Sequence, residues 1–418
     1  MSDDFRSEPK GSGPLVANGL SHQSNLRQVL FERIRAAGTI ARVDAARGLD
    51  ISPATVTALT GDLIEMGLVR EYSTRRDTGR GRPRVSIGIV PEARHVIGLK
   101  LSDKQHTAVL TDLAGNVLAS VAKDRETPLP ETDALYALIE EMIEEVCAAA
   151  NMKRADISAV GVGVPGFVEH EEGRIQWSPL IKERNVEVAQ TASLRLGLPV
   201  TIDNDANLAT LAELWFGSGR EERDFAVVTI EHGVGMGMVI NHRLYRGSNG
   251  LGMELGHTKV QMQGALCRCG QRGCLEAYLA DYALAREAPT ALGPKRQYTA
   301  NHHEMVADLY AEAVNGDQGA LSIFRRAGQY LALGLANVSN LFDPGRIILS
   351  GVRMQYDLLY ADNVLREVEQ MVVSRGKPPP PIEVRAWGDL IWARGAAALA
   401  LDLVCNDVLE DKKEVAAE

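Results

Sequence analysis

Cysteine and aromatic residues are scarce in this sequence. Its 418 residues include five cysteines, and Phe, Trp and Tyr together make up 5% of the chain. Cys147 and Cys405 stand alone, and the other three cysteines fall within eight positions of one another. This distribution excludes the evenly paired disulfide framework of a small secreted domain. We therefore expect a cytoplasmic protein whose thiols stay reduced.

Long hydrophobic runs are also missing. No apolar stretch approaches the roughly 20 residues that cross a bilayer. The first residues, Met1–Arg6, lack the basic-then-apolar order of a signal peptide. We expect a soluble protein with no membrane partner, and the length predicts two or three domains of about 100–200 residues each.

Positive charge is in deficit overall but is unevenly spread. The net charge is -10, which argues against general affinity for nucleic acid. Residues 25–90, however, hold eleven Arg against seven Asp or Glu, so the remainder must carry -14. The sequence therefore predicts a basic module joined to an acidic body.

The basic module has the pattern of a helix-turn-helix. Residues 1–23 are rich in Ser, Gly and charge, so we expect a flexible arm. Apolar residues at helical spacing predict a helix from about Leu26 to Gly38, and a second short helix follows through Val43 and Ala46. A third helix begins with an N-cap serine and a proline at its first position. Such a helix enters the DNA major groove, and its expected contacts are Ser52, Pro53, Ala54, Thr55 and Thr57.

An arginine-rich hairpin completes this module. Residues 68–89 have the pattern strand, loop, strand, which is typical of a wing. Arginines on such a loop bind phosphate or reach into the minor groove; the alternative is a solubilising loop or a protein-binding patch. The candidate DNA contacts are Arg75, Arg76, Arg80, Arg82 and Arg84. We assign residues 24–90 to a winged helix-turn-helix domain that binds a double-stranded DNA operator.

Beyond Pro91 the pattern is that of an α/β protein. Strands are expected at 95–101, 106–112, 117–121, 157–164, 199–202, 225–231, 235–240 and 346–350, and helices at 133–150, 207–216, 320–341 and 389–403. The order strand, strand, strand, helix, strand recurs in part, which indicates two lobes with a ligand crevice. We expect the first lobe at 91–200 together with a C-terminal helix at about 385–405, the second at 201–384, and a flexible tail at 406–418.

Acidic and amide side chains gather where one short apolar strand ends. The run Asp203–Asn207 opens a helix directly after that strand, and ligands of α/β sheets bind at the carboxyl ends of strands. An aspartate here could act as a general base on a hydroxyl or accept its hydrogen bond without chemistry. Helix capping is the alternative, and it accounts for one of these residues only.

A histidine and three cysteines form the most specific motif of the chain. His257, Cys267, Cys269 and Cys274 have the spacing His-x9-Cys-x-Cys-x4-Cys. One imidazole and three thiolates make a closed tetrahedral set for one structural Zn²⁺ per chain, against the alternative of buried structural thiols. Glu254 and Glu276 flank the motif, and a loop fixed by zinc would hold both carboxylates where a polyol needs them.

Together these features resemble the ROK family of repressors and sugar kinases. The resemblance rests on the winged helix, the run Asp203–Asn207, the run Glu254–His257 and the cysteine motif, and it covers about residues 24–405. It implies an α/β fold with an N-terminal winged helix-turn-helix followed by a two-lobed, actin-like (ribonuclease H-like) domain. It also implies sugar contacts by Asn204, Asp205, Glu254, His257 and Glu276, with one ring nitrogen of His257 on the sugar and the other on zinc.

The chain departs from the family's kinases in both phosphate loops. Lys100–Gln105 replaces Asp-x-Gly-Gly-Thr-Lys, and Glu231–Gly235 replaces Gly-Thr-Gly-x-Gly. Leu180 also stands at the position that the resemblance assigns to a sugar-binding Asn of those kinases. Because phosphoryl transfer depends on positioning and neutralising Mg·ATP, we expect no enzyme activity.

We therefore expect a sugar-responsive DNA-binding transcriptional regulator, a repressor of carbohydrate uptake or catabolism genes, acting as a homodimer or a dimer of dimers. The helix near 320–341 is a candidate dimer interface or simply part of the core. The alternatives are a ROK sugar kinase with an added DNA-binding domain and a regulator whose effector is a protein partner.

Overall fold

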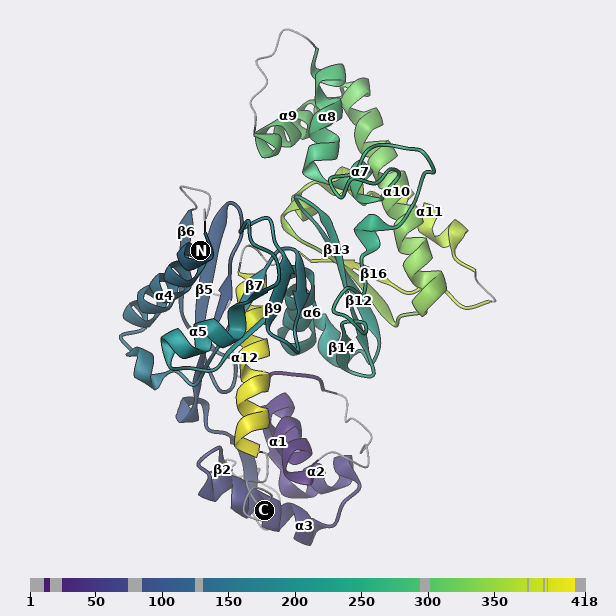
Figure 1. Ribbon diagram of the computed structural model, residues 1–418. Helices are drawn as coiled ribbons and strands as arrows, with labels where there is room; N and C mark the ends of the chain where they lie inside the picture. Colours follow the sequence, from purple (N-terminus) through teal and green to yellow (C-terminus); the bar gives the residue numbers. More distant parts are fainter. Residues whose placement is uncertain are drawn as a thin grey trace. The chain divides into compact units, whose positions relative to one another are not determined.

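The computed structural model describes residues 11–15, 25–73, 85–124, 131–293, 301–373, 376–385, 388 and 390–409 (Figure 1). The chain divides into two compact units. The first comprises Met1–Arg223 and Leu390–Glu418, and the second comprises Asp224–Asp389. Among the described residues, no helix is long and apolar enough to cross a membrane.

A winged helix-turn-helix begins the first unit. It consists of α1 (Leu26–Ala37), α2 (Arg42–Leu49) and α3 (Pro53–Glu65), with β1 (Thr39–Ala41), β2 (Val69–Ser73) and β3 (Val85–Ile89) in the sheet order β1-β3-β2. Leu30, Ile34 and Leu63 are fully buried between the helices. Leu59 of α3 is only partly buried, whereas Thr60 is buried, so the buried face of α3 includes Thr60.

The rest of the first unit is built on a five-stranded sheet of order β11-β7-β4-β5-β6. Its strands are β4 (His95–Lys100), β5 (Gln105–Asp112), β6 (Val117–Asp124), β7 (Ala159–Val164) and β11 (Val200–Asn204). A smaller sheet contains β8 (Phe167–Glu169), β9 (Arg174–Trp177) and β10 (Val186–Glu187). The α-helices are α4 (Thr132–Ala149), α5 (Val188–Leu196), α6 (Asp205–Phe216) and α12 (Ile391–Leu409), and the 3-10 turns are η1 (Pro91–Ala93), η2 (Arg154–Asp156) and η3 (Ser218–Glu221). β4 and β7 pair in parallel, and every residue of β7 is buried, as expected for a strand covered on both faces.

The second unit repeats this sheet. Its order is β14-β13-β12-β15-β16, formed by β12 (Phe225–Ile230), β13 (Val234–Ile240), β14 (Arg243–Tyr245), β15 (Arg346–Ser350) and β16 (Ile382–Val384). In both sheets an antiparallel meander of three strands is extended by two parallel strands. The α-helices are α7 (Glu276–Leu279), α8 (Asp281–Leu292), α9 (His302–Val314), α10 (Gln318–Phe342) and α11 (Asp362–Met371), and the 3-10 turns are η4 (Leu255–His257), η5 (Val352–Gln355) and η6 (Asp357–Leu359). The shared topology confirms the duplicated α/β fold.

The units divide later in the sequence than the expected boundary at residue 200. β11 pairs in parallel with β7, so Asn204 and Asp205 belong to the first unit, which extends to Arg223. A short apolar strand followed by a helix has the same local pattern in either lobe. Only the pairing partner of β11 therefore decides to which unit this strand belongs. The chain returns to the first unit at Leu390, where α12 packs closely. A Cβ at Gly395 would lie 1.8 Å from the Leu208 carbonyl oxygen of α6.

Candidate functional site

The four candidate metal ligands of the second unit come together. The ligand atoms of His257, Cys267, Cys269 and Cys274 all lie within 4.8 Å of one another. Cys267 Sγ is 3.7 Å from His257 Nδ1, and Cys269 Sγ is 3.7 Å from Cys274 Sγ. Sulfur ligands about 2.3 Å from a tetrahedral zinc would be about 3.8 Å apart, so the observed spacing suits a metal ion bound by these residues.

Local backbone geometry holds this loop together. The backbone of Lys259 forms an isolated antiparallel β-bridge with that of Cys274, and the backbone of Leu266 forms another with that of Arg272. At Gly273 the φ angle is +78°, and a Cβ there would lie 1.9 Å from the Gln261 carbonyl oxygen. The glycine beside Cys274 is therefore required for the close approach that brings the ends of the loop together.

The thiols differ in their readiness to lose a proton. Burial raises the pKa of Cys267 to about 12. Burial alone would also raise the pKa of Cys269, but the backbone N–H of Gln271 and the neighbouring thiols lower it below the ordinary value. Lys259 Nζ lies 3.0 Å from Cys274 Sγ, and this hydrogen bond raises the pKa of the lysine. A cation bound here would displace the thiol protons and hold all three sulfurs as thiolates.

Two expected sugar contacts flank the same loop. The buried Glu276 opens α7, and its Oε2 accepts a hydrogen bond from the Val234 N–H at 3.3 Å. Glu254 is more exposed, and its Oε2 lies 3.9 Å from His257 Nε2. The Nδ1 of His257 faces the thiols and its Nε2 faces the Glu254 side, so the two ring nitrogens have separate surroundings.

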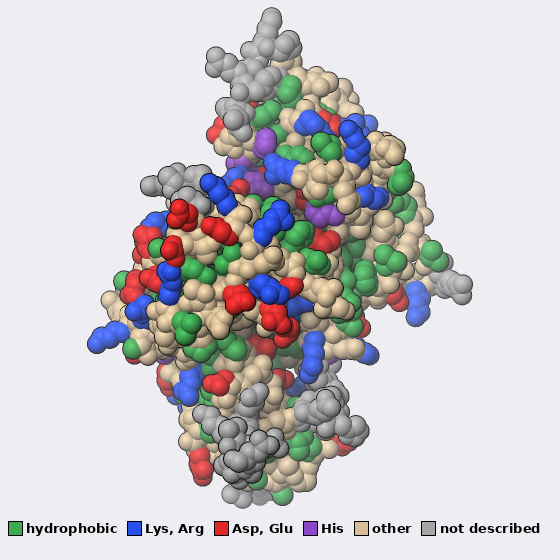
Figure 2. All heavy atoms as spheres, viewed as in Figure 1, with side chains coloured by type: hydrophobic (Ala, Val, Ile, Leu, Met, Phe, Trp, Pro, Cys, Tyr) green, Lys and Arg blue, Asp and Glu red, His purple; other side chains and the backbone are tan. Residues whose placement is uncertain are grey.

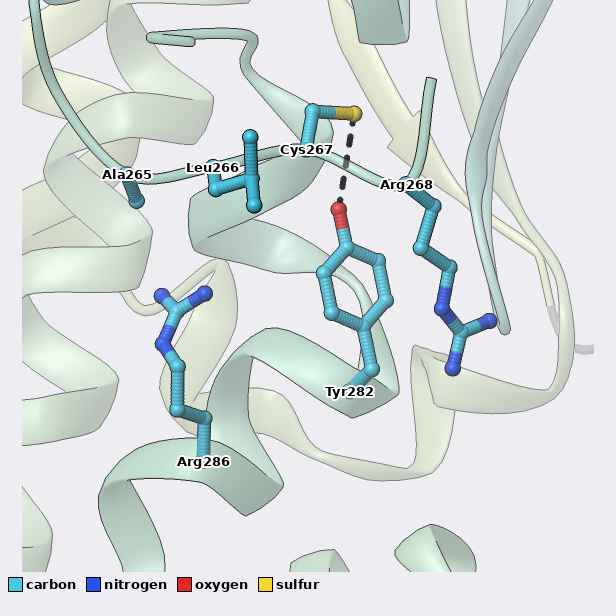
Figure 3. Close-up of a pocket in the computed structure, with 6 residues that line it drawn as sticks. All are labelled: Ala265, Leu266, Cys267, Arg268, Tyr282 and Arg286. Carbon is cyan, nitrogen blue, oxygen red and sulfur yellow. Dashed lines mark hydrogen bonds between the residues drawn. The ribbon is translucent and has the colours of Figure 1, made fainter. Parts of the chain in front are cut away.

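Tyr282 is a part of this site that the sequence reasoning missed. Its hydroxyl lies 3.5 Å from Cys267 Sγ (Figure 3). The same hydroxyl lies 3.4 Å from Glu276 Oε1. Burial raises the pKa of Tyr282, so the phenol stays protonated and can donate to either group. It lines a cavity of about 500 Å³ with Ala265, Leu266, Cys267, Arg268 and Arg286. Tyr282 thus links a candidate metal ligand to a candidate sugar contact.

The other two expected sugar contacts lie at the carboxyl end of β11 in the first unit. Asn204 caps α6, because its Oδ1 accepts from the Ala206 N–H at 2.8 Å, and its amide donates to the Gly166 carbonyl at 2.7 Å. An amide group carries two N–H donors, so one remains beyond the Gly166 bond. Asp203 is fully buried and accepts from Asn207 Nδ2 at 2.8 Å. It has a structural role, which leaves Asp205 as the partly exposed carboxylate of this run.

The loop after β12 is fixed by a buried ion pair. His232 Nδ1 lies 3.0 Å from Asp281 Oδ2, and Arg353 contacts both carboxylate oxygens of Asp281. Asp281 and Arg353 are 1% and 2% exposed. Burial alone would raise the pKa of Asp281, but hydrogen bonds from His232 and Arg353 lower it. His303 Nδ1 also lies 2.8 Å from Arg353 Nη1.

The loop after β4 also has its own interactions. Lys100 Nζ lies 3.4 Å from the ring centre of Trp392. The hydroxyl of Ser102 accepts from the Lys104 and Gln105 N–H groups and donates to the Gln105 carbonyl, so the turn closes on itself. Leu180 is 2% exposed and belongs to the core of the first unit.

The expected DNA-contacting residues of α3 lie at its exposed N-terminal end. Ser52 Oγ accepts from the Thr55 N–H at 3.0 Å, which confirms the N-cap, and Thr57 Oγ1 donates to the Pro53 carbonyl at 2.8 Å. Ser52, Pro53, Ala54 and Thr57 are exposed, and Thr55 is half-buried. The five arginines expected in the wing lie outside the described residues. On the face shown in Figure 2, acidic and basic side chains are interspersed.

Comparison with known proteins gives one family. The sequence model of the ROK family matches residues 96–403. The N-acetylglucosamine repressor of Escherichia coli O6:H1 is 29% identical over 406 residues, which are 96% of this chain and 98% of that protein. A putative xylose repressor of a Caldicellulosiruptor species is 30% identical over 384 residues, which are 89% of this chain and 93% of that protein.

Solved structures agree on the fold. A ROK family transcriptional regulator, a homologue of Escherichia coli Mlc, has a TM-score of 0.75 with 24% identity, covering 92% of this chain and 98% of that chain. The ROK hexokinase of Thermus thermophilus has a TM-score of 0.63 with 29% identity, covering 74% of this chain and 99% of that chain. These likenesses and the repeated sheet confirm the predicted fold, a winged helix followed by a duplicated actin-like domain.

Proposed function

Because the chain belongs to the ROK family, we propose that it is a sugar-responsive DNA-binding transcriptional regulator, and more narrowly a repressor of genes for carbohydrate uptake or catabolism. The observation that carries this proposal is the winged helix. Its α3 presents a capped, exposed N-terminal end, on the same chain as the ROK domain. The two repressors are similar over most of this chain, including that segment.

The proposed effector is a sugar or a sugar derivative. The candidate contacts for its hydroxyls are Asn204 and Asp205 in the first unit and, in the second unit, Glu254, His257 and Glu276. Carboxylates accept hydrogen bonds from hydroxyls, and these charge-assisted bonds are the stronger kind. In support, Glu276 and His257 are held by Val234, Tyr282 and the cysteine loop, and a positioned site loses less entropy when it binds its ligand.

The proposed metal is one structural Zn²⁺ per chain, held by His257, Cys267, Cys269 and Cys274. Three thiolates and one imidazole suit zinc and fill its tetrahedral shell, and the sulfur–sulfur spacing supports this choice. When bound, zinc supplies only a fixed crosslink. His257, using Nδ1 as the ligand, would then direct Nε2 toward the sugar.

We propose a regulator without kinase activity, active in the cytoplasm as a homodimer or a dimer of dimers. Lys100 and Ser102 stand in place of the first phosphate loop and His232 in place of the second, and each contacts neighbouring residues, which argues against the kinase alternative. A helix-turn-helix dimer reads two half-sites about one helical turn apart, so size-exclusion chromatography with light scattering is expected to give at least twice the chain mass.

Operator binding measured against a sugar panel tests the proposal. DNA fragments selected from the genome by the purified protein provide the operator, and N-acetylglucosamine, its 6-phosphate, xylose and glucose provide the panel. We expect one sugar to raise the melting temperature and to change operator affinity. Asp205→Asn and Glu254→Gln should each lower the affinity for that sugar about ten- to a hundred-fold, which is a loss of about 1.5–3 kcal/mol of binding free energy. Operator affinity without the sugar should stay at the wild-type value. A protein that selects no DNA, or variants that respond at the wild-type sugar concentration, would contradict it.

A further inference from the structure

A buried arginine joins the winged helix to the rest of the first unit. Arg35, in the last turn of α1, is 3% exposed. Its guanidinium carbon lies 4.0 Å from the ring centre of Trp215, the second-last residue of α6, and its Nη1 donates to Cys405 Sγ of α12 at 3.3 Å. Within the described residues this guanidinium pairs with no carboxylate, and its Nε has no hydrogen-bond partner. A buried charge satisfied only in part costs free energy, so this contact calls for an explanation.

A short N-terminal segment, Gly11–Leu15, closes the same contact, and we call it the strap. Three of its backbone N–H groups donate hydrogen bonds, one to α1 and two to residues at and after the end of α6: Ser12 to the Arg35 carbonyl at 3.1 Å, Gly13 to the Trp215 carbonyl at 2.9 Å, and Leu15 to the Arg220 carbonyl at 2.8 Å. Ser12 is 2% exposed. The strap is therefore bonded to both the winged helix and the rest of the first unit, so these five residues are held in place where a flexible arm was expected.

Arg220 adds a second crosslink. Its Nε donates to the Gly13 carbonyl at 2.9 Å, and its Nη2 donates to the Ala36 carbonyl at 2.7 Å. A cation at the C-terminal end of α1 also interacts favourably with the helix dipole. Together, Arg35, Trp215, Arg220 and the strap form what we call the α1–α6 joint.

The same helix α6 carries Asp205 at its other end. α6 has 12 residues, which is about 18 Å at roughly 1.5 Å per residue. Leu208 through Trp215 are all buried, and Gly395 lets the backbone of α12 lie directly against Leu208. A helix packed in this way moves as one body, so a shift of the first turn at Asp205 reaches Trp215 in the last.

We propose that α6 couples effector binding at Asn204 and Asp205 to the winged helix, and that the α1–α6 joint is the contact that transmits the effect. This inference rests on the proposed function, since it names how that sugar site controls DNA binding. An effector changes operator affinity only through a difference in its affinity for two states. Because the guanidinium is incompletely satisfied, opening the joint would cost less free energy than breaking a fully paired contact, and a sugar at α6 would bias that opening.

Arg35→Met tests the joint, because methionine keeps much of the length and apolar contact of arginine and removes its charge. The probe is the panel sugar that most stabilises the wild type, and the measured quantity is the ratio of operator Kd with and without that sugar. We expect sugar affinity and sugar-free operator affinity within about two-fold of wild type, and a ratio that falls to near 1. Coupling is reciprocal, so operator DNA should likewise stop changing sugar affinity. Arg154→Met removes an exposed arginine of the same unit and should keep the wild-type ratio.

A second variant keeps the proposal testable where Arg35→Met does not fold. Trp215→Phe retains an aromatic ring with a weaker attraction for a cation, and it should give a ratio between wild type and 1. If Arg35→Met and Trp215→Phe both keep the wild-type ratio of operator Kd with and without the sugar, the coupling is overturned while the proposed function stands. A wild-type protein that binds no sugar of the panel overturns the proposed function and the coupling with it.

Discussion

Among the candidate metal ligands Cys269 is exposed, whereas Cys267 and Cys274 are buried. A serine there keeps the size of the side chain but supplies a poor zinc ligand. We expect Cys269→Ser to lose about one zinc per chain, to melt at a lower temperature and to lose its sugar response, because metal binding supplies folding free energy to the loop that holds Glu254 and Glu276.

Elemental analysis of the purified protein measures the metal, and a thermal melt measures the stability. Cys147→Ala changes a cysteine outside the motif and should retain the metal. Wild-type protein that contains no zinc would contradict the assignment.

The buried pair of Asp281 and Arg353 predicts a pH-dependent stability. Removing one partner of a buried ion pair costs about 3–5 kcal/mol, so Asp281→Asn should lower the free energy of unfolding by that order at pH 7. Its pKa is lowered in the folded protein. The stability it contributes is therefore present above the ordinary aspartate pKa of about 3.9 and is lost as the pH falls through the folded value.

Urea titrations of wild type and Asp281→Asn at pH 7 and pH 3.5 measure this effect, and the difference between the two proteins should shrink at the lower pH. The exposed Asp357, which accepts a hydrogen bond from Tyr310, provides the matched control Asp357→Asn. A difference that grows on acidification would contradict the assigned direction.

At the scale of single elements, α3 and the hairpin after it should affect DNA binding differently. Arg80→Ala with Arg82→Ala removes two candidate phosphate contacts, and each such contact contributes about 0.9 to the slope of log K against log salt. The double variant should weaken binding to all sequences and flatten the slope by about two. Thr57→Ala, on the exposed end of α3, should instead change which bases are preferred. Fluorescence anisotropy at several salt concentrations measures both effects, and unchanged affinity in the double variant would contradict the wing assignment.

Elements with regular patterns were predictable, and those without were not. The strand at Arg346–Ser350 has the predicted bounds, and α4 and α10 agree within a few residues, because their apolar residues run continuously or at helical spacing. Residues 243–314 contain β14 and the helices α7, α8 and α9, for which no element was predicted. Glycines, short helices and the irregular loop that holds the candidate metal ligands leave little periodicity there.

The candidate site divides in the same way. The residues of the cysteine motif lie close together in the sequence, and so do those of the run Asp203–Asn207. Both groups could therefore be recognised from the sequence alone. Arg353 and Asp281 are separated by 72 positions, and no local pattern links them. Tyr282 resembles any tyrosine in an amphipathic helix until its hydroxyl is seen beside Cys267 and Glu276. Chemistry carried by adjacent residues can be predicted from sequence, whereas chemistry assembled by the fold cannot.

At the scale of the whole molecule, the question is whether the kinase fold retains its reaction. Phosphoryl transfer requires Mg·ATP to be held and its charge neutralised. In this chain Lys100 contacts Trp392, Ser102 closes the turn after β4, and Asp281 holds His232 in the turn after β12. The protein should therefore show no ATP-dependent phosphorylation of hexoses, pentoses or amino sugars, even though it keeps Asp205 as a candidate general base.

A coupled assay for ADP release, run with Mg·ATP and each sugar on a preparation that contains zinc and binds its sugar in a thermal shift, measures this activity. Sugar binding without turnover would mean that the fold keeps sugar recognition and no longer holds Mg·ATP for the reaction. Turnover that disappears in Asp205→Ala would instead show that Asp205 still acts as a base, and that Mg·ATP is held by groups other than the two altered loops.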